Sequence, residues 1–219
     1  MIRRQTLEFL KKLSANNSRE WFHANRALYD ASRANVTEFV TLLLGEMSKF
    51  DHTLTGLEAE DCLFRIFRDT RFSREKTPYK TNFGSFMKSG GRSTPGAGYY
   101  LHIEPGNSFV SGGIYMPPAP LLLAIRTAIA RDPAPFKKII AAPALVNLFG
   151  GLSGETLVTA PKGFPRDHPE IELLKYKHYM VFRGVSEKTV LSKEFASVCI
   201  EAFMAMRTFN AYLNEVMGL

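Results

Sequence analysis

The four residues 104–107, "EPGN", constrain the fold of this chain more than any other part of its sequence. They lie between "GYYLHI" and "SFVSGGIYM", two segments rich in aromatic and β-branched residues. Adjacent proline and glycine are typical of a tight turn, and a turn this short joins neighbouring antiparallel strands. The sequence therefore predicts a β-hairpin over residues 98–116. Gly112 and Gly113 in its second strand indicate a bulge or the close approach of another backbone.

The segments around this hairpin predict the fold class. "CLFRIF" and "NFGSFMK" before it, and "ETLVTA" and "YMVFRGV" after it, have the composition of strands. Apolar residues recur at helical spacing in both terminal regions, and Asn17 and Glu20 form a capping-box pattern at one helix start. This order predicts an α+β fold, with a mainly antiparallel sheet of about five to six strands packed with long N-terminal and C-terminal helices.

The length of 219 residues, with 45% hydrophobic residues, suits one domain that buries a core. We expect a single α+β domain over residues 1–219. Its expected parts are N-terminal helices over 5–48, a sheet region over 62–116, mixed helices and strands over 118–184, and a C-terminal helix over 192–216.

The composition argues against several classes of protein. The chain lacks the apolar run of a membrane span or a signal peptide, so we expect a soluble, cytoplasmic protein with no membrane partner. Cys62 and Cys199 are too few for a disulfide framework, and the five histidines lack the spacing of metal ligands. We therefore expect reduced core cysteines, no metal and no cofactor. The net charge of +7 is spread thinly along the chain, which supports nucleic-acid binding only weakly.

The densest cluster of charge is "FRIFRDTRFSREKTPYKTNFG", residues 64–84. Its basic residues are Arg65, Arg68, Arg71, Arg74, Lys76 and Lys80. If "CLFRIFRD" is a strand, alternation places Arg65 and Arg68 on opposite faces, each among bulky apolar side chains. At least one of these two arginines should then be partly buried. It needs a partner, because an unpaired buried guanidinium is very costly.

The sequence leaves two kinds of partner open. Six basic and five acidic residues between positions 58 and 80 nearly balance, which favours internal ion pairs. The acidic candidates are Glu58, Glu60, Asp61, Asp69 and Glu75. Alternatively, Arg65 and Arg68 anchor an external phosphate or carboxylate, which arginine holds bidentately. The second contacts of that ligand would be Arg71, Arg74, Lys76 and Lys80, in the turn-rich segment after the strand.

The strand "GYYLHIEP" adds candidate polar groups. Alternation places Tyr100, His102 and Glu104 on one face, where they would form a pocket with the arginines if the two strands lie side by side. His102 or Glu104 would then be the proton-transfer group of an enzyme, and Tyr79 and Tyr100 would line the wall. The alternative is that this row is the solvent-facing side of an antiparallel sheet.

Several runs together resemble the domain of unknown function 2461 family. They are "NNSREWF" (16–22), "CLFRIFRDTRFSREKTPYKTNFG" (62–84), "AGYYLHIEPG" (97–106), "GGIYMP" (112–117) and "PKGFPRDHPEIELLKYKHYMV" (161–181). The resemblance covers nearly the whole chain. It implies a soluble, single-domain α+β protein with no assigned activity, and it supplies no catalytic residues.

Three hypotheses of function follow from the sequence. The preferred one is a protein, with or without enzymatic activity, that binds a small anionic, phosphate-bearing ligand at the basic segment. The second is nucleic-acid binding through the same segment. The third is a structural or interaction protein whose arginines are all paired internally. The sequence identifies neither a substrate, nor a reaction, nor an oligomeric state.

Overall fold

A computed structural model of the chain describes residues 1–69, 71 and 76–219, which form two compact units. Unit 1 consists of Met1–Ser93, Tyr100–Val110 and Gly184–Glu201, and unit 2 consists of Thr94–Tyr99, Ser111–Arg183 and Ala202–Leu219. Each unit is therefore built from segments that are far apart in the sequence. The expectation of a single domain stays a prediction.

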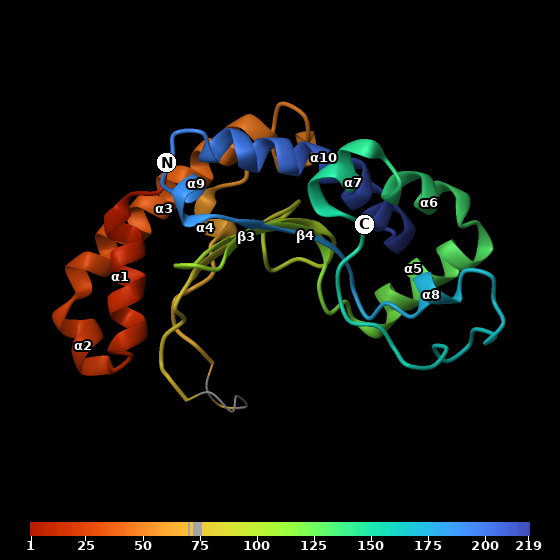
Figure 1. The fold of residues 1–219 in the computed structure, drawn as a ribbon, viewed down its shortest axis with the longest axis horizontal. Coiled ribbons are helices and arrows are strands. Elements are labelled where there is room, and N and C mark those ends of the chain that lie inside the picture. Colours follow the sequence, from red (N-terminus) through yellow and green to blue (C-terminus); the bar gives the residue numbers. More distant parts are fainter. Residues whose placement is uncertain (70, 72–75) are drawn as a thin grey trace. The chain divides into compact units, whose positions relative to one another are not determined.

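The sheet confirms the α+β class and the hairpin. The described residues form one antiparallel sheet in the order β1-β2-β3-β4 (Figure 1). Its strands are β1 (Phe83–Met87), β2 (Gly98–Ile103), β3 (Ser108–Ile114) and β4 (Tyr179–Val185). In the turn between β2 and β3, the amide of Asn107 donates to the carbonyl of Glu104 at 3.1 Å. Gly106 has a φ of 75° in this turn, a conformation that glycine adopts without strain.

The predicted number of five to six strands is wrong, because two expected strands make only isolated bridges. In the first, "CLFRIF" and the residues after it, Leu63 bridges to Ser85 and Phe67 bridges to Tyr79. The second, "ETLVTA", forms a bridge through Thr156. Strand-like composition favours an extended backbone, but a ladder also needs a partner that stays in register over several residues. The described sheet has four strands.

The two glycines of β3 are required by close contacts in unit 2. Gly113 has a φ of 109°, and a β-carbon there would clash with the carbonyl oxygen of Tyr179. A β-carbon at Gly112 would clash with the side chain of Met206. The predicted close approach of another backbone is therefore confirmed at Gly113.

The N-terminal helices lie in unit 1. They are α1 (Arg4–Ala15), α2 (Arg19–Ala24) and α3 (Arg26–Met47). Unit 1 also contains the short helices η1 (His52–Leu54) and α4 (Ala59–Cys62), and from later in the sequence α9 (Glu187–Val190). The helices expected over 5–48 are thus present, interrupted between α1 and α2 and again at Asn25. The predicted N-cap was wrong by one residue. Ser18, rather than Asn17, accepts a hydrogen bond from the Trp21 amide at the start of α2.

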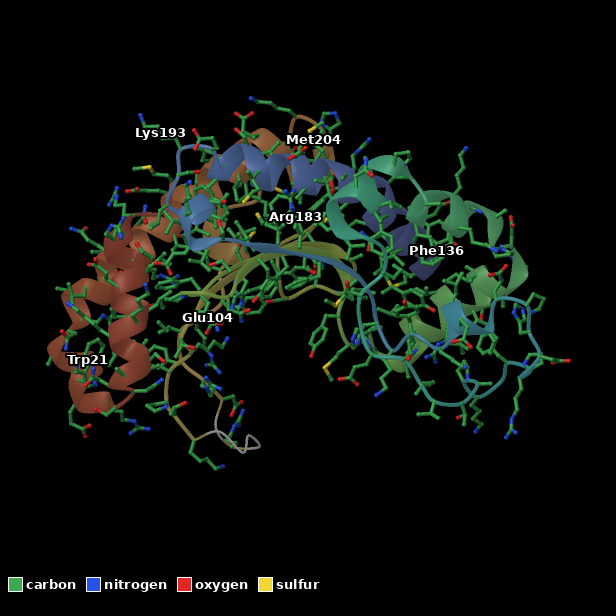
Figure 2. The ribbon with its side chains drawn as sticks, in the orientation of Figure 1. Trp21, Glu104, Phe136, Arg183, Lys193 and Met204 are labelled. Carbon is green, nitrogen blue, oxygen red and sulfur yellow. The ribbon has the colours of Figure 1, made fainter. Side chains whose placement is uncertain are left out.

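The remaining helices are α5 (Ala119–Arg131), α6 (Ala134–Ile140), α7 (Pro143–Phe149) and α8 (Ile171–Leu174) in unit 2, and α10 (Phe195–Met217). The C-terminal helix predicted over 192–216 is therefore confirmed. Within unit 2, its residues Met206, Phe209 and Leu213 are fully buried. Phe136 of α6, labelled in Figure 2, belongs to this core. Its ring packs edge-on against Tyr179 of β4, with ring centroids 5.7 Å apart. Helical spacing of large apolar side chains builds this core, as the sequence indicated.

An aromatic core holds the helices of unit 1 against β1. The buried ring of Phe9 lies 6.3 Å from Trp21, 6.0 Å from Tyr29 and 6.4 Å from Phe83, measured between centroids. Such rings bury large areas and fix the geometry of the elements that carry them. This core therefore sets where α1, α2 and α3 lie relative to the basic segment that precedes β1.

Candidate functional site

The basic segment forms an arm, residues 64–82, in which two extended stretches pair with each other. The amide of Arg68 donates to the carbonyl of Pro78 at 2.9 Å, and the amide of Lys80 donates to the carbonyl of Ile66 at 2.8 Å. Figure 1 shows the arm as the orange and yellow chain that runs away from the sheet. The described part of this arm comprises residues 64–69, 71 and 76–82.

The amide side chain of Asn17 fixes the arm to the helices. Its Nδ2 donates to the carbonyl of Tyr79 at 3.0 Å, and its Oδ1 accepts from the amide of Tyr79 at 3.1 Å. The ring of Tyr79 also stacks on Phe22 of α2, with centroids 4.0 Å apart. Sequence reasoning missed this role of Asn17, because its position before a helix favoured a cap.

The two strand arginines differ in burial, as alternation predicted. Arg65 is exposed, whereas Arg68 is half-buried, and its Nε is shielded from solvent with no hydrogen-bond partner among the described residues. Neither arginine forms an ion pair within that part of the chain. The choice between an internal and an external partner, which the sequence left open, therefore stays open, and within the described residues the buried Nε of Arg68 is left without an acceptor.

Three of the described acidic residues of this segment have other partners. Asp69 binds Arg71 bidentately, with its Oδ2 2.7 Å from Nη2 and its Oδ1 3.0 Å from Nε. The hydrogen bonds from Arg71 hold the pKa of Asp69 far below its usual value, and Arg65 adds a weaker attraction. Glu58 and Asp61 form a capping box at α4. These carboxylates do not neutralise Arg68.

Lys80 lies close to both arginines. Its Nζ is 5.2 Å from the centroid of the Phe64 ring, a cation–π contact. Burial lowers the pKa of Lys80, and the positive charges of Arg65 and Arg68 lower it further. We call Arg65, Arg68 and Lys80 the cationic cluster. Three like charges on one small surface repel one another, so the cluster gains stability from any anion that joins it.

The structure describes three of the other ligand residues predicted in the arm. Arg71 and Lys76 are exposed. Tyr79 is 2% exposed, so its ring is mainly a packing group. Arg74 lies outside the described residues.

Tyr100, His102 and Glu104 form a hydrogen-bonded chain on one face of β2, as alternation predicted. The Tyr100 hydroxyl lies 3.1 Å from His102 Nδ1, and His102 Nε2 lies 3.2 Å from Glu104 Oε2. The ring of Phe109 stacks on His102 with centroids 4.5 Å apart. A β-carbon at Gly84 would come within 2.6 Å of the Tyr100 hydroxyl, so glycine is needed beside the chain.

The protonation of this chain follows from its burial. Burial lowers the pKa of His102, although Glu104 acts in the opposite direction. Burial also works to raise the pKa of Glu104, but hydrogen bonds from Thr81, Asn107 and His102 outweigh it and leave that pKa lowered. Near neutral pH, a neutral His102 therefore donates from Nε2 to the Glu104 carboxylate and accepts the Tyr100 hydroxyl at Nδ1. Burial raises the pKa of Tyr100 to about 12, so its hydroxyl stays protonated.

Thr81 and Asn107, which sequence reasoning missed, bind the carboxylate of Glu104 at the end of this hydrogen-bonded chain. Thr81 Oγ1 donates to Glu104 Oε1 at 2.7 Å, and Asn107 Nδ2 donates to Oε2 at 3.0 Å. Glu104 and Thr81 also line a cavity of about 400 Å³ together with residues of α1, beside which Glu104 lies in Figure 2. The fold brings Thr81 close to Glu104, and the turn after β2 brings Asn107 close to it. A single threonine or asparagine is too common in a sequence to indicate such a role.

The arginines and the Tyr100–His102–Glu104 chain do not form one pocket. Within the described residues, no hydrogen bond or ion pair joins Arg65 or Arg68 to that chain. Phe64 lies between the two groups, with its ring edge-on to Tyr100 at 6.3 Å and its face toward Lys80. The site therefore consists of two neighbouring clusters.

Among the residues that the structure describes, no group of three His, Cys, Asp or Glu side chains is placed to hold a metal ion. In the same residues, every helix is too short or too polar to cross a membrane.

Comparison with known proteins identifies the family. The model of the family described as "Conserved hypothetical protein (DUF2461)" matches residues 5–212. The chain belongs to the DUF2461 family. This match spans the arm, β2 and Asn17, and confirms the resemblance seen in the sequence. Neither the curated proteins nor the solved structures that were searched gave a match.

Proposed function

We propose that this DUF2461 protein binds a small phosphate-bearing anion at the cationic cluster. The observation that carries the proposal is the placement of Arg65, Arg68 and Lys80. The charges of Arg65 and Arg68 lower the pKa of Lys80, and the buried Nε of Arg68 has no hydrogen-bond partner among the described residues. Arg68 and Arg65 would anchor the anion, and Lys80 would add a point charge. Arg71, Arg74 and Lys76 are the proposed outer contacts, whereas Tyr79 packs against Phe22 and Tyr100 belongs to the separate hydrogen-bonded chain.

A thermal-shift assay tests this proposal. Inorganic phosphate and ribose 5-phosphate should raise the Tm by about 5–10 °C at about 100 times Kd, relative to chloride at equal ionic strength. Arg65→Ala should fold normally, because Arg65 is exposed, and should lose most of this rise. The matched control is Arg166→Ala, which removes an exposed arginine of unit 2.

The competing hypotheses predict other results. If the arginines only brace the fold, Arg68→Ala unfolds the protein and no anion raises the Tm of the wild type. An equal rise in wild type and Arg65→Ala would also contradict the proposal, because the anion would then bind elsewhere.

We also propose that Glu104, with His102, transfers a proton to or from a ligand in the separate cavity that Glu104 lines. The support is the chain from Tyr100 to Glu104, whose carboxylate reaches a cavity. Each ligand that raises the Tm is incubated with wild type and Glu104→Gln, and the products are measured by ³¹P NMR. Conversion by the wild type alone supports the proposal, and the absence of conversion for every stabilising ligand removes it.

A further inference from the structure

A second cavity opens beside the cationic cluster, between α2 and the arm. It has a volume of about 310 Å³ and lies within unit 1. Its lining residues are Arg19, His23, Phe67, Arg68, Pro78 and Tyr79. The clamp from Asn17 to Tyr79 holds its two walls together, since Asn17 lies two residues before the start of α2 and Tyr79 belongs to the arm. The cavity is therefore a product of the same contact that fixes the arm.

Three of the six residues that line this cavity are basic. Arg19, His23 and Arg68 come from two different elements, and none of the six lining residues is acidic. Two acids are adjacent in sequence to lining residues: Glu20 is engaged at the helix start by its own backbone and by Ser18, and Asp69 is paired with Arg71. A concave surface with cationic side chains and no carboxylate selects anions.

Arg68 connects this cavity to the cationic cluster. Its guanidinium lines the cavity, its Nε lacks an acceptor among the described residues, and its charge lowers the pKa of Lys80. An oxyanion in the cavity would lie next to a delocalised cation that has lost water without gaining a counter-ion. Charge-assisted bonds to arginine are strongest in such partly buried places.

The apolar part of the lining is an aromatic surface. Phe67 is 46% exposed, which is high for a phenylalanine, yet its ring is held from behind by buried rings. Its centroid lies 6.0 Å from Phe22 and 5.4 Å from Tyr79. An exposed aromatic side chain whose position is fixed by packing is a suitable platform for stacking a flat ring.

We propose that this cavity binds a phosphate monoester that carries a flat, unsaturated ring, such as a nucleoside monophosphate. Arg19, His23 and Arg68 hold the phosphate, and Phe67 stacks against the ring. The volume suits one small ligand and lies at the low end of the range for such pockets. This inference rests on the proposed function, because Arg68 belongs to both sites.

Calorimetric titration with adenosine 5′-monophosphate and ribose 5-phosphate tests the inference. We expect the nucleotide to bind at least about fivefold more tightly, which is the advantage of one stacked base. Phe67→Ala should abolish this difference and leave ribose 5-phosphate binding unchanged. Arg19→Ala should weaken both compounds. The controls are Phe182→Ala, which removes a phenylalanine that is 41% exposed on β4, and Arg166→Ala.

The outcomes separate this inference from the proposed function. If both compounds bind with equal affinity, or if Phe67→Ala keeps the difference, the inference is wrong and anion binding at the cluster stands. If Arg19→Ala binds both compounds like the wild type, the phosphate does not lie in this cavity. If neither compound binds the wild type, both proposals fail.

Discussion

At the scale of single residues, the site depends on side chains whose charge is set by their neighbours. Lys80 and His102 are both driven toward their neutral forms by burial, but for Lys80 the charges of Arg65 and Arg68 act in the same direction. For His102, the neighbouring Glu104 acts against burial. An anion near the cluster would raise the pKa of Lys80 again. The pKa of Lys80 should therefore change when an anion binds at the cluster.

The lowered pKa of His102 predicts a pH dependence of stability. In the unfolded chain, His102 takes up its proton as the pH falls through about 6.5, whereas the folded protein resists this until lower pH. The free energy of unfolding should therefore fall as the pH drops from about 7 toward 5. Glu104, whose pKa is also lowered, adds a loss only below about 4.5.

Urea unfolding of wild type and His102→Gln between about pH 5 and 8 measures this effect. Below about pH 6.5, the free energy of unfolding of the variant should depend less steeply on pH than that of the wild type. The difference in slope should be at most what the binding of one proton contributes. His52→Gln, which alters an exposed histidine of η1, serves as the control and should keep the wild-type slope. Equal slopes for wild type and His102→Gln would contradict the prediction.

At the scale of elements, the arm owes its position to the stretch between α1 and α2. Asn17 satisfies both backbone groups of Tyr79, as a neighbouring strand would, and Phe22 stacks on the Tyr79 ring. The arm carries the cationic cluster and one wall of the basic cavity. The loss of this attachment should therefore affect binding as well as stability.

We expect Asn17→Ala to destabilise the protein by about 1–3 kcal/mol, because it leaves two part-buried backbone groups without partners. Hydrogen exchange should show faster exchange of the Tyr79 amide. Asn17→Asp keeps the acceptor for that amide and loses only the donor, so it should be intermediate. Asn16→Ala, which removes a single exposed hydrogen bond to α1, is the control. Unchanged exchange at Tyr79 in Asn17→Ala would show that packing alone holds the arm.

At the scale of the whole molecule, the net charge of +7 attracts any polyanion. Such attraction is sequence-independent and is screened by salt. Binding in the basic cavity should be screened less, because Arg68 is partly buried. The two kinds of binding can therefore be separated by ionic strength.

We expect any affinity for a single-stranded oligonucleotide to fall by at least about tenfold between about 50 and 200 mM salt. The affinity for adenosine 5′-monophosphate should change much less over the same range. Fluorescence anisotropy with a labelled oligonucleotide and calorimetry with the nucleotide give the two salt slopes. A flat slope for a tightly bound oligonucleotide would instead favour nucleic acid as the ligand.

Much of the fold was predictable because local patterns determine it. The "EPGN" turn with its flanking strands, the apolar stripe of α10, and the alternation of Tyr100, His102 and Glu104 all depend on residues close in sequence. The number of strands was not predictable in this way. Leu63 and Phe67 lie in a segment with the composition of a strand, but they form only isolated bridges, because a ladder requires a partner that stays in register over several residues.

The sequence by itself determined the α+β class, the hairpin, the family and the location of the basic segment. Only the tertiary structure decided that Asp69 pairs with Arg71, that Arg68 keeps an Nε without an acceptor, and that Asn17 clamps Tyr79. The physical reason is that ion pairs and buried hydrogen bonds depend on distances of a few ångströms between groups. Composition shows which charges are present, but only the folded chain places them.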